Sequence, residues 1–255
     1  MRKAILSTLA GLGLLAGVAG SAHAAGPTEA LPDVSFSHEG VFGSYDRAAA
    51  QRGFQVFEQV CSACHSAKYL TFRNLADLGY NEDEIKAIAA KKQVEDGPDG
   101  NGDMFQRPAA ASDAWPSPYA NDNQARASNG GALPPDLSLL AKARLGGEHY
   151  VYAVLTGYEE PPAGVEVRPG LYYNKYFPGH MIGMPPPLAN DMVPYGDNTP
   201  ATVQQMSHDV SVFLTWLAEP KMEERKQMGI KSILFLLALT ILFYVVKRRI
   251  WARIH

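Results

Sequence analysis

The chain contains very little cysteine. Only two of its 255 residues are cysteines, Cys61 and Cys64, and they lie three positions apart. A pair so close in sequence cannot cross-link distant segments, so no structural disulfide stabilises the long loops of this chain. The two thiols must therefore either pair locally or do chemistry.

Basic residues are also scarce over most of the chain. Residues 25–220 hold 24 Asp plus Glu and 13 Lys plus Arg, a balance of −11, whereas residues 221–255 hold 2 and 8, a balance of +6. Nucleic-acid binding needs a basic surface, so the composition argues against it. An acidic domain suits a cationic soluble partner attracted over long range, although the same charge also serves plain solubility.

Long apolar runs occur only at the two ends, and the first is short. Arg2 and Lys3 precede an apolar run at residues 4–19, and residues 22–24 read Ala-His-Ala. This pattern predicts a signal peptide, residues 1–24, that is cleaved on export. A retained membrane anchor is the alternative.

The second run predicts a single membrane span. Residues 230–246 read IKSILFLLALTILFYVV, and as a helix they would cover about 26 Å, close to the hydrocarbon thickness of a bilayer. A buried core helix is the alternative, but the run is apolar on all sides and residues 247–249 are all basic, which favours the bilayer with a cytoplasmic C-terminus. We expect an exported domain at residues 25–220, a membrane helix with its flanks at 221–249 and a cytoplasmic tail at 250–255.

The two cysteines belong to the motif Cys61-Ser62-Ala63-Cys64-His65. A disulfide or a thioredoxin-like redox site would use the same spacing, yet the histidine directly after the second cysteine is typical of covalent haem attachment. In that chemistry the thiols form thioethers with the haem vinyl groups, and His65 presents an imidazole nitrogen to the iron.

Helical patterns surround this motif. Residues 46–60 predict a helix that starts at Asp46, has Phe54, Phe57 and Val60 on one side, and crosses another helix closely at Gly53. The remaining predicted helices are 81–93 with a capping box at its start, 136–144, 148–156, and a last helix with Thr199 as its cap that ends near Pro220. Residues 96–135 and 161–200 are rich in Gly and Pro and predict long irregular loops. No internal repeat is present, and the pattern requires no sheet.

A methionine in the second loop is a candidate second iron ligand. His180, Met181 and Met184 all lie there, and local chemistry favours Met184. Gly183 allows close backbone approach to the porphyrin, and the three prolines at 185–187 stiffen the chain that follows. Met181 is better explained as a packing residue.

Several motifs together resemble the cytochrome c1 family, the haem c subunits of the quinol–cytochrome c oxidoreductases. They are CSACH at 61–65, NGGALPPDL at 129–137, ARLGGEHYVYAVLTGYEEPP at 143–162, IGMPPP at 182–187 and the single C-terminal span. The resemblance covers nearly all of residues 35–250. It implies a class I cytochrome c-like, all-α domain with long irregular loops, plus one C-terminal transmembrane helix, in a member of bacterial type.

The resemblance also implies a set of site residues. Cys61 and Cys64 match the thioether positions, His65 the proximal ligand, and Met184 the methionine ligand. Arg144 matches an arginine near a haem propionate, although from sequence alone it could equally be a solvated charge at a helix end. The other matches, to haem-pocket positions, are Asn129, Pro135 and Tyr150.

The implied function is electron relay in a complex with cytochrome b and a Rieske iron–sulfur protein, in a dimeric assembly of the bacterial inner membrane. One haem c on the periplasmic side would pass electrons from the Rieske protein to a soluble or tethered c-type cytochrome in a respiratory or photosynthetic chain. This subunit would bind no quinone and catalyse nothing by itself. Two alternatives stay open, a free-standing anchored cytochrome and a haem peroxidase-type enzyme whose iron keeps an open site.

Overall fold

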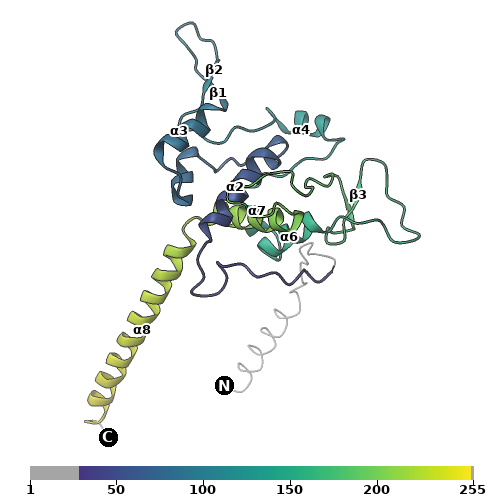
Figure 1. The fold of residues 1–255 in the computed structure, drawn as a ribbon. Helices are drawn as coiled ribbons and strands as arrows, with labels where there is room; N and C mark the ends of the chain where they lie inside the picture. The colour runs from purple at the N-terminus through teal and green to yellow at the C-terminus, as the bar shows by residue number, and fades with distance from the viewer. Residues whose placement is uncertain (1–28, 254–255) are drawn as a thin grey trace, which may run out of the picture.

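The computed structural model describes residues 29–253, and the predicted signal peptide lies outside them. Its centre is built from three helices, α2 (Arg47–Gln59), α6 (Gly147–Thr156) and α7 (Val203–Ala218). A fourth helix, α8 (Met222–Trp251), leaves the domain as an isolated rod, as Figure 1 shows. The fold is mostly helical, as predicted.

Helix α2 forms as its sequence predicts. Asp46 is its N-cap, and its Oδ1 accepts hydrogen bonds from the backbone N–H groups of Ala48 and Ala49, which have no partner inside the helix. Phe54 and Phe57 are fully buried, whereas Val60 is only half-buried. The predicted apolar face is therefore confirmed for its two largest members.

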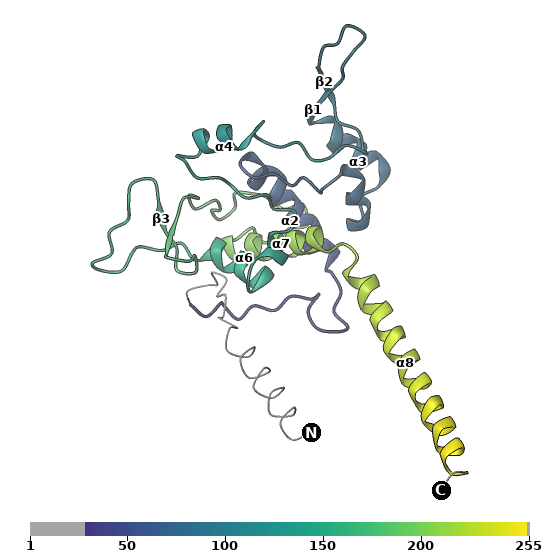
Figure 2. The same ribbon diagram turned by 180° about the vertical axis from the view of Figure 1, so that it is seen from behind.

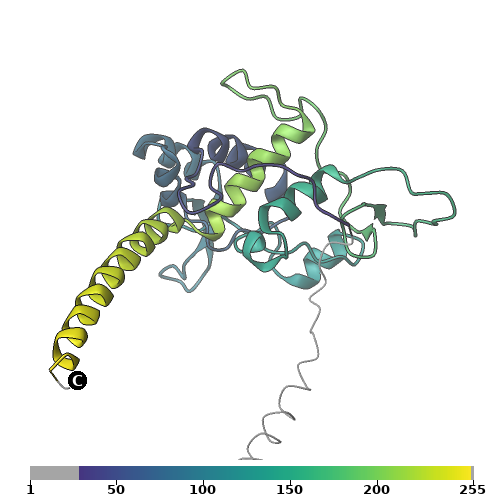
Figure 3. The ribbon, with the colours of Figure 1, turned by 90° about the horizontal axis from the view of Figure 1, so that it is seen from below.

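Helices α2 and α7 cross in direct contact at Gly53. A Cβ atom at this position would lie 2.0 Å from the carbonyl oxygen of Asp209 and 2.8 Å from the Cβ of Phe213. Only glycine permits this approach, so the predicted close crossing is confirmed. Figure 3 shows the two helices from below, with α8 continuing beyond the end of α7.

The core beside this crossing is aromatic. Phe213 of α7 lies 5.7 Å from Phe54 and 5.4 Å from Phe57, measured between ring centroids. Trp115, from an irregular segment, meets the same two rings at 5.7 and 5.4 Å. These tilted and edge-on contacts add to the hydrophobic gain of burying the rings. The end of α2, which leads into the haem motif, is thereby fixed in the core.

A buried ion pair joins the same two helices. The side chain of Asp209 is fully buried, and its Oδ2 accepts a hydrogen bond of 2.8 Å from Nε of Arg52. The same guanidinium donates to Asp197 at 2.7 Å. These two acids hold the pKa of Arg52 above its usual range despite its burial, so the guanidinium stays charged.

Helix α8 is tied to the domain at its first turns. Nζ of Lys226 donates hydrogen bonds to the carbonyl oxygens of His38 and Gly43. The carboxylate of Glu223 accepts from the backbone N–H of Tyr45 at 2.7 Å and pairs with Arg47 at 2.9 Å. Beyond these contacts the apolar side chains of α8 are exposed. By length and composition the helix could cross a membrane, and it extends the predicted span at both ends.

The remaining elements are short. In chain order they are η1 (Cys61–Ala63), η2 (Phe72–Leu78), α3 (Glu82–Ala90), β1 (Gln93–Asp96), β2 (Phe105–Pro108), α4 (Asp122–Ser128), α5 (Leu140–Ala143), β3 (Tyr172–Tyr173) and β4 (Met181–Ile182). Strands β1 and β2 pair antiparallel, as do β3 and β4. The β1–β2 hairpin projects from the domain on the side opposite α8 (Figures 1 and 2).

Four sequence predictions need correction. The helix that starts at the Asn81 capping box ends at Ala90, because Gln93 already pairs with Pro108. The loop at 96–135 contains part of a hairpin and α4, and the loop at 161–200 contains β3 and β4, so two small sheets exist. The cap of the last soluble helix is Thr202, whose Oγ1 accepts from the N–H of Gln205.

The fourth correction concerns Asp136. The helix predicted from this residue is reduced to α5, four residues long. Oδ2 of Asp136 instead accepts from the hydroxyl of Ser66 at 2.7 Å and from the N–H of Lys68 at 3.0 Å. Its carboxylate therefore binds the chain next to the haem motif rather than capping a helix.

Candidate haem site

The cysteine motif forms a tight turn at the end of α2. Val60 ends the helix, η1 follows directly, and the carbonyl oxygen of Cys61 accepts from the N–H groups of both Cys64 (3.1 Å) and His65 (2.9 Å). The backbone of all three functional residues is thus fixed by one acceptor. Because α2 is held by its crossing with α7, the position of this turn follows from the core.

The environment of Cys61 differs from that of a reactive redox thiol. Both cysteines are free, and burial raises the pKa of the Cys61 thiol to about 12. Reactive Cys-x-x-Cys sites depend on a thiol whose pKa is lowered, which makes it a thiolate at neutral pH. The environment of Cys61 therefore argues against a thioredoxin-like function and leaves the haem reading.

His65 is oriented as a metal ligand. Its Nδ1 lies 2.8 Å from the carbonyl oxygen of Pro135. A carbonyl oxygen can only accept, so Nδ1 carries the proton and Nε2 keeps its lone pair. Burial lowers the pKa of His65 despite the nearby carbonyl, so the imidazole is neutral at pH 7. A neutral imidazole with a fixed ring and a free Nε2 is what haem iron requires.

The segment that holds His65 is itself held by Asp136. Besides its bonds to Ser66 and Lys68, Asp136 accepts from the backbone N–H of Ser138 at 2.9 Å. The backbone N–H of Leu137 donates to the carbonyl oxygen of Ser66 at 2.8 Å. The chain after Pro135 is therefore paired with the chain after His65. This pairing keeps the carbonyl oxygen of Pro135 within hydrogen-bond distance of Nδ1 of His65.

A cavity opens beside Cys64. Its volume is about 530 Å³, within the range of small-molecule and cofactor sites. Its walls come from the chain after the haem motif, from the stretch before and inside α4, and from the segment before Pro135. They are formed by Cys64, Ser66, Lys68, residues 117–123, Ala125, Leu133 and Pro134.

Met184 lies in a second small apolar cluster. This half-buried residue packs against Tyr150, Val154 and Ile182, and its carbonyl oxygen accepts from the hydroxyl of Tyr158 at 3.0 Å. A Cβ added to Gly183 would lie 3.1 Å from the Cβ of Ala132. The methionine loop thus approaches Ala132, which lies in the segment that carries Pro135.

The other predicted pocket residues have different surroundings. Tyr150 is buried in α6, and that burial raises the pKa of its phenol. Asn129 ends α4, where its Nδ2 donates to the carbonyl oxygen of Ala125 at 2.7 Å and to the hydroxyl of Tyr119 at 3.0 Å. Arg144 is exposed, and no carboxylate of the described residues pairs with it. Its charge is therefore available to an anionic group.

Sequence reasoning missed three contributors. Asp136 and Ser66 position the backbone around His65, and Tyr158 fixes the carbonyl of Met184. The only sequence signal for Asp136 is its position directly after Pro135, in a motif that resembles the family. Residues 117–122, which line the cavity, carry no motif that would mark them.

Comparisons with known proteins identify the family of this chain. A profile of the Cytochrome C1 family matches residues 36–254. The chain is 46% identical to cytochrome c1 of Rhodospirillum rubrum over 267 residues, covering 98% of both chains. It is 52% identical to the mitochondrial heme protein cytochrome c1 2 of Arabidopsis thaliana, covering 86% of this chain and 71% of that one.

The name of a third relative combines cytochrome b and cytochrome c1. The chain is 46% identical to the protein called cytochrome b/c1 of Bradyrhizobium diazoefficiens, covering 88% of this chain but only 36% of that protein. The family profile spans nearly all the residues that the structure describes, and the bacterial relative is matched from end to end. This chain belongs to the cytochrome c1 family.

Proposed function

We propose that this chain holds one haem c through thioethers to Cys61 and Cys64, with the iron between Nε2 of His65 and the sulfur of Met184. The chain would act as the electron-relay subunit of a quinol–cytochrome c oxidoreductase, between a Rieske iron–sulfur protein and a c-type cytochrome. The bound group supplies a one-electron couple between ferrous and ferric iron. The observation that carries the proposal is the 2.8 Å hydrogen bond from Nδ1 of His65 to Pro135.

Each residue has a defined task in this proposal. The turn at 61–65 presents the two thiols and the imidazole from one rigid helix end. The Pro135 carbonyl holds the tautomer and ring orientation of His65 and raises its basicity as a ligand. The guanidinium of Arg144, which forms no ion pair within residues 29–253, would balance a propionate. Asn129 and Tyr150 would close the pocket.

Met184 is favoured over its two neighbours by its place in the loop. Met181 is paired with Tyr173 in the β3–β4 ladder, and the ring of His180 stacks on the ring of Tyr173 at 5.5 Å. Met184 lies beyond the ladder, where the following prolines restrict the chain. A thioether is a neutral, soft donor that stabilises ferrous iron and raises the potential.

The partners and the topology are part of the proposal. The Bradyrhizobium relative, whose name pairs cytochrome b with c1, supports a cytochrome b neighbour. Helix α8, with exposed apolar sides and Arg248 and Arg249 in its last turn, supports a single span with a cytoplasmic end. The haem domain, residues 25–220, would then face the periplasm of a bacterial inner membrane. No quinone site and no independent catalysis are assigned to this subunit.

Replacing Met184 with Leu tests the ligand assignment. We expect loss of the methionine-to-iron charge-transfer band in the oxidised protein, carbon monoxide binding in the reduced protein, and a sharply lower reduction potential. Met181→Leu is the matched control, because it removes a sulfur from the same loop, and it should leave all three properties nearly unchanged. If the two variants exchanged these phenotypes, Met181 would be the ligand.

The wild-type protein tests the function in the same experiments. Six-coordinate iron that fails to bind carbon monoxide supports electron relay, whereas ready binding would favour a peroxidase-type enzyme. Copurification in mild detergent with a cytochrome b and an iron–sulfur protein is expected. A chain that purifies alone from its native membrane would instead be a free-standing anchored cytochrome.

A further inference from the structure

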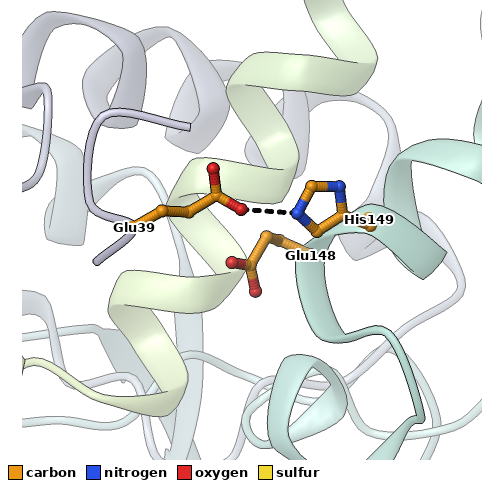
Figure 4. A group of neighbouring side chains, drawn as sticks. All are labelled: Glu39, Glu148 and His149. Atoms are coloured by element: carbon orange, nitrogen blue, oxygen red, sulfur yellow. Dashed lines mark hydrogen bonds and ion pairs between the residues drawn. The ribbon is translucent and has the colours of Figure 1, made fainter. Parts of the chain in front are cut away.

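A second cluster of metal-binding side chains lies where the segment before α2 meets the first turn of α6. Glu39 comes from that segment, and Glu148 and His149 come from α6 (Figure 4). One ligand atom of each residue lies within 4.8 Å of the others. Nε2 of His149 and Oε1 of Glu39 are 2.6 Å apart. None of these residues contributes to the proposed haem site.

A buried histidine beside this cluster lacks a hydrogen bond. His38 is 3% exposed, and within residues 29–253 neither of its ring nitrogens makes one. Its Nε2 lies 3.4 Å from Oε1 of Glu148, which is close enough for a charge interaction but not a good hydrogen bond. A buried polar atom without a partner is costly. His38, Glu39 and Glu148 line one cavity of about 400 Å³.

The lysines near this cavity are committed elsewhere. Nζ of Lys226 donates to the carbonyl oxygens of His38 and Gly43. Nζ of Lys142 lies 3.4 Å from a carboxylate oxygen of Glu219. No lysine or arginine of the described residues forms an ion pair with Glu39 or Glu148, whose only such partners are histidines. The two carboxylates and two imidazoles thus face one another without a fixed cation.

We propose that Glu39, Glu148 and His149 bind a divalent transition-metal cation of the zinc type, with His38 as a fourth donor through Nε2. Zinc takes four nitrogen and oxygen donors in a tetrahedron at about 2.0–2.2 Å, so donor atoms lie about 3.3–3.6 Å apart. For Glu39, Glu148 and His149, whose ligand atoms lie within 4.8 Å of one another, small side-chain movements reach this spacing. Nε2 of His38 is 3.4 Å from Oε1 of Glu148 but lies outside that group, so it would move further to complete the site. Calcium and magnesium prefer oxygen ligands alone, so two imidazoles disfavour them.

The cation would join two segments that the sequence separates by about a hundred residues. His38 and Glu39 precede α2, whereas Glu148 and His149 open the helix that carries Tyr150. Binding would replace the direct contact between Oε1 of Glu39 and Nε2 of His149, and would give Nε2 of His38 a partner. The site would therefore stabilise the packing of the N-terminal segment against α6, independently of the iron.

The test uses the haem-loaded, full-length protein in its detergent-solubilised native assembly. After chelator treatment, the protein is titrated with zinc chloride, and bound metal is measured by equilibrium dialysis for wild type, Glu39→Gln and His149→Gln. At low free zinc, we expect wild type to bind one more zinc per chain than either variant does. At higher zinc, both variants should bind this zinc with an affinity at least tenfold weaker than that of wild type. X-ray absorption should report nitrogen and oxygen ligands with imidazole and no sulfur.

The control is Glu166→Gln, which makes the same change at an exposed loop position, and it should bind zinc as wild type does. Comparing complexes that differ at one residue cancels zinc held by other subunits. The haem absorbance of each variant reports whether it folds, and Glu39→Gln keeps an oxygen at a position outside any helix. Equal zinc binding by wild type and both variants would overturn the proposal, as would calcium binding equal to that of zinc.

Discussion

Replacing Gly53 with Ala should open the crossing between α2 and α7. The new Cβ would lie 2.0 Å from the carbonyl oxygen and 2.5 Å from the carbonyl carbon of Asp209. Both atoms belong to the backbone of α7, so no side-chain rotation relieves the overlap. The helices must separate by about 1.4 Å to reach an ordinary contact of about 3.4 Å, and overpacking of this kind costs about 3 kcal/mol.

Part of this cost is offset. Alanine favours a helix interior by about 1 kcal/mol over glycine, so the net loss of stability is about 2 kcal/mol. For a domain of this size each kcal/mol lowers the unfolding midpoint by about 2–4 °C, which predicts a decrease of about 4–8 °C. Because α2 leads directly into the cysteine motif, the displaced helix should also lower the yield of covalently bound haem.

The assay compares Gly53→Ala with Gly229→Ala in the solubilised assembly. Gly229 is also a helical glycine, in α8, but nothing lies within 4 Å of a Cβ built there. Haem-stained gels measure attachment, and the loss of haem absorbance on heating measures the midpoint. Gly229→Ala should not lower either quantity. If Gly53→Ala matched Gly229→Ala in both, the argument from the close crossing would be refuted.

Three further predictions concern charge and topology. Asp209→Asn leaves the Arg52 guanidinium without its buried counter-charge and should cost about 3–5 kcal/mol of stability, seen as a lower thermal midpoint. The control, Glu82→Gln at the exposed pair with Lys86, should leave the midpoint unchanged. Equal midpoints for the two variants would contradict the stabilising role of the buried pair. A reporter active only in the periplasm should work when fused before Pro220 and fail after His255; the opposite pattern would exclude the single-span topology. The association rate with a cationic cytochrome should fall steeply as salt shortens the Debye length to about 8 Å, whereas a rate indifferent to salt would exclude electrostatic attraction by the acidic domain.

The sequence predicted best those elements whose physics is local. The cap at Asp46 and the capping box at Asn81 are confirmed because each joins a side chain to a backbone only a few residues away. Gly53 was readable because a glycine within a strongly amphipathic helix needs a reason. The apolar run in α8 needed no tertiary context at all.

The errors arose at residues whose type suits a helix cap but whose hydrogen bonds lie elsewhere. Asp136 has the sequence signature of a helix cap, yet its carboxylate binds Ser66 and Lys68, some seventy residues away. Thr199 precedes a proline and looks like a cap, but its N–H instead donates to Oδ1 of Asp197 at 3.0 Å. Local propensity cannot separate these cases, because both uses need the same residue type.

The predictions of site residues show the same difference between local and distant interactions. The motif at 61–65 named the covalent positions and His65 because attachment requires that spacing. Pro135 was named only through the family resemblance, as a haem-pocket position, and its carbonyl contact with His65 could be read only from the structure, because a backbone carbonyl acts regardless of its side chain. The family likewise pointed to Asn129, but its bonds to Ala125 and Tyr119 could be read only from the structure.

The structure also shows which of the acidic residues make local contacts that stabilise the fold. Glu84 completes a capping box, and Asp96 pairs with Arg107. Asp99 accepts backbone hydrogen bonds that lower the pKa of its carboxyl, with the bond from Asp103 as the largest cause. These three carboxylates are therefore engaged by local contacts. The β1–β2 hairpin projects opposite α8 (Figure 1). Acidic charge on this hairpin that no local contact balances therefore lies on the side away from the proposed membrane. A soluble cytochrome would approach from that side.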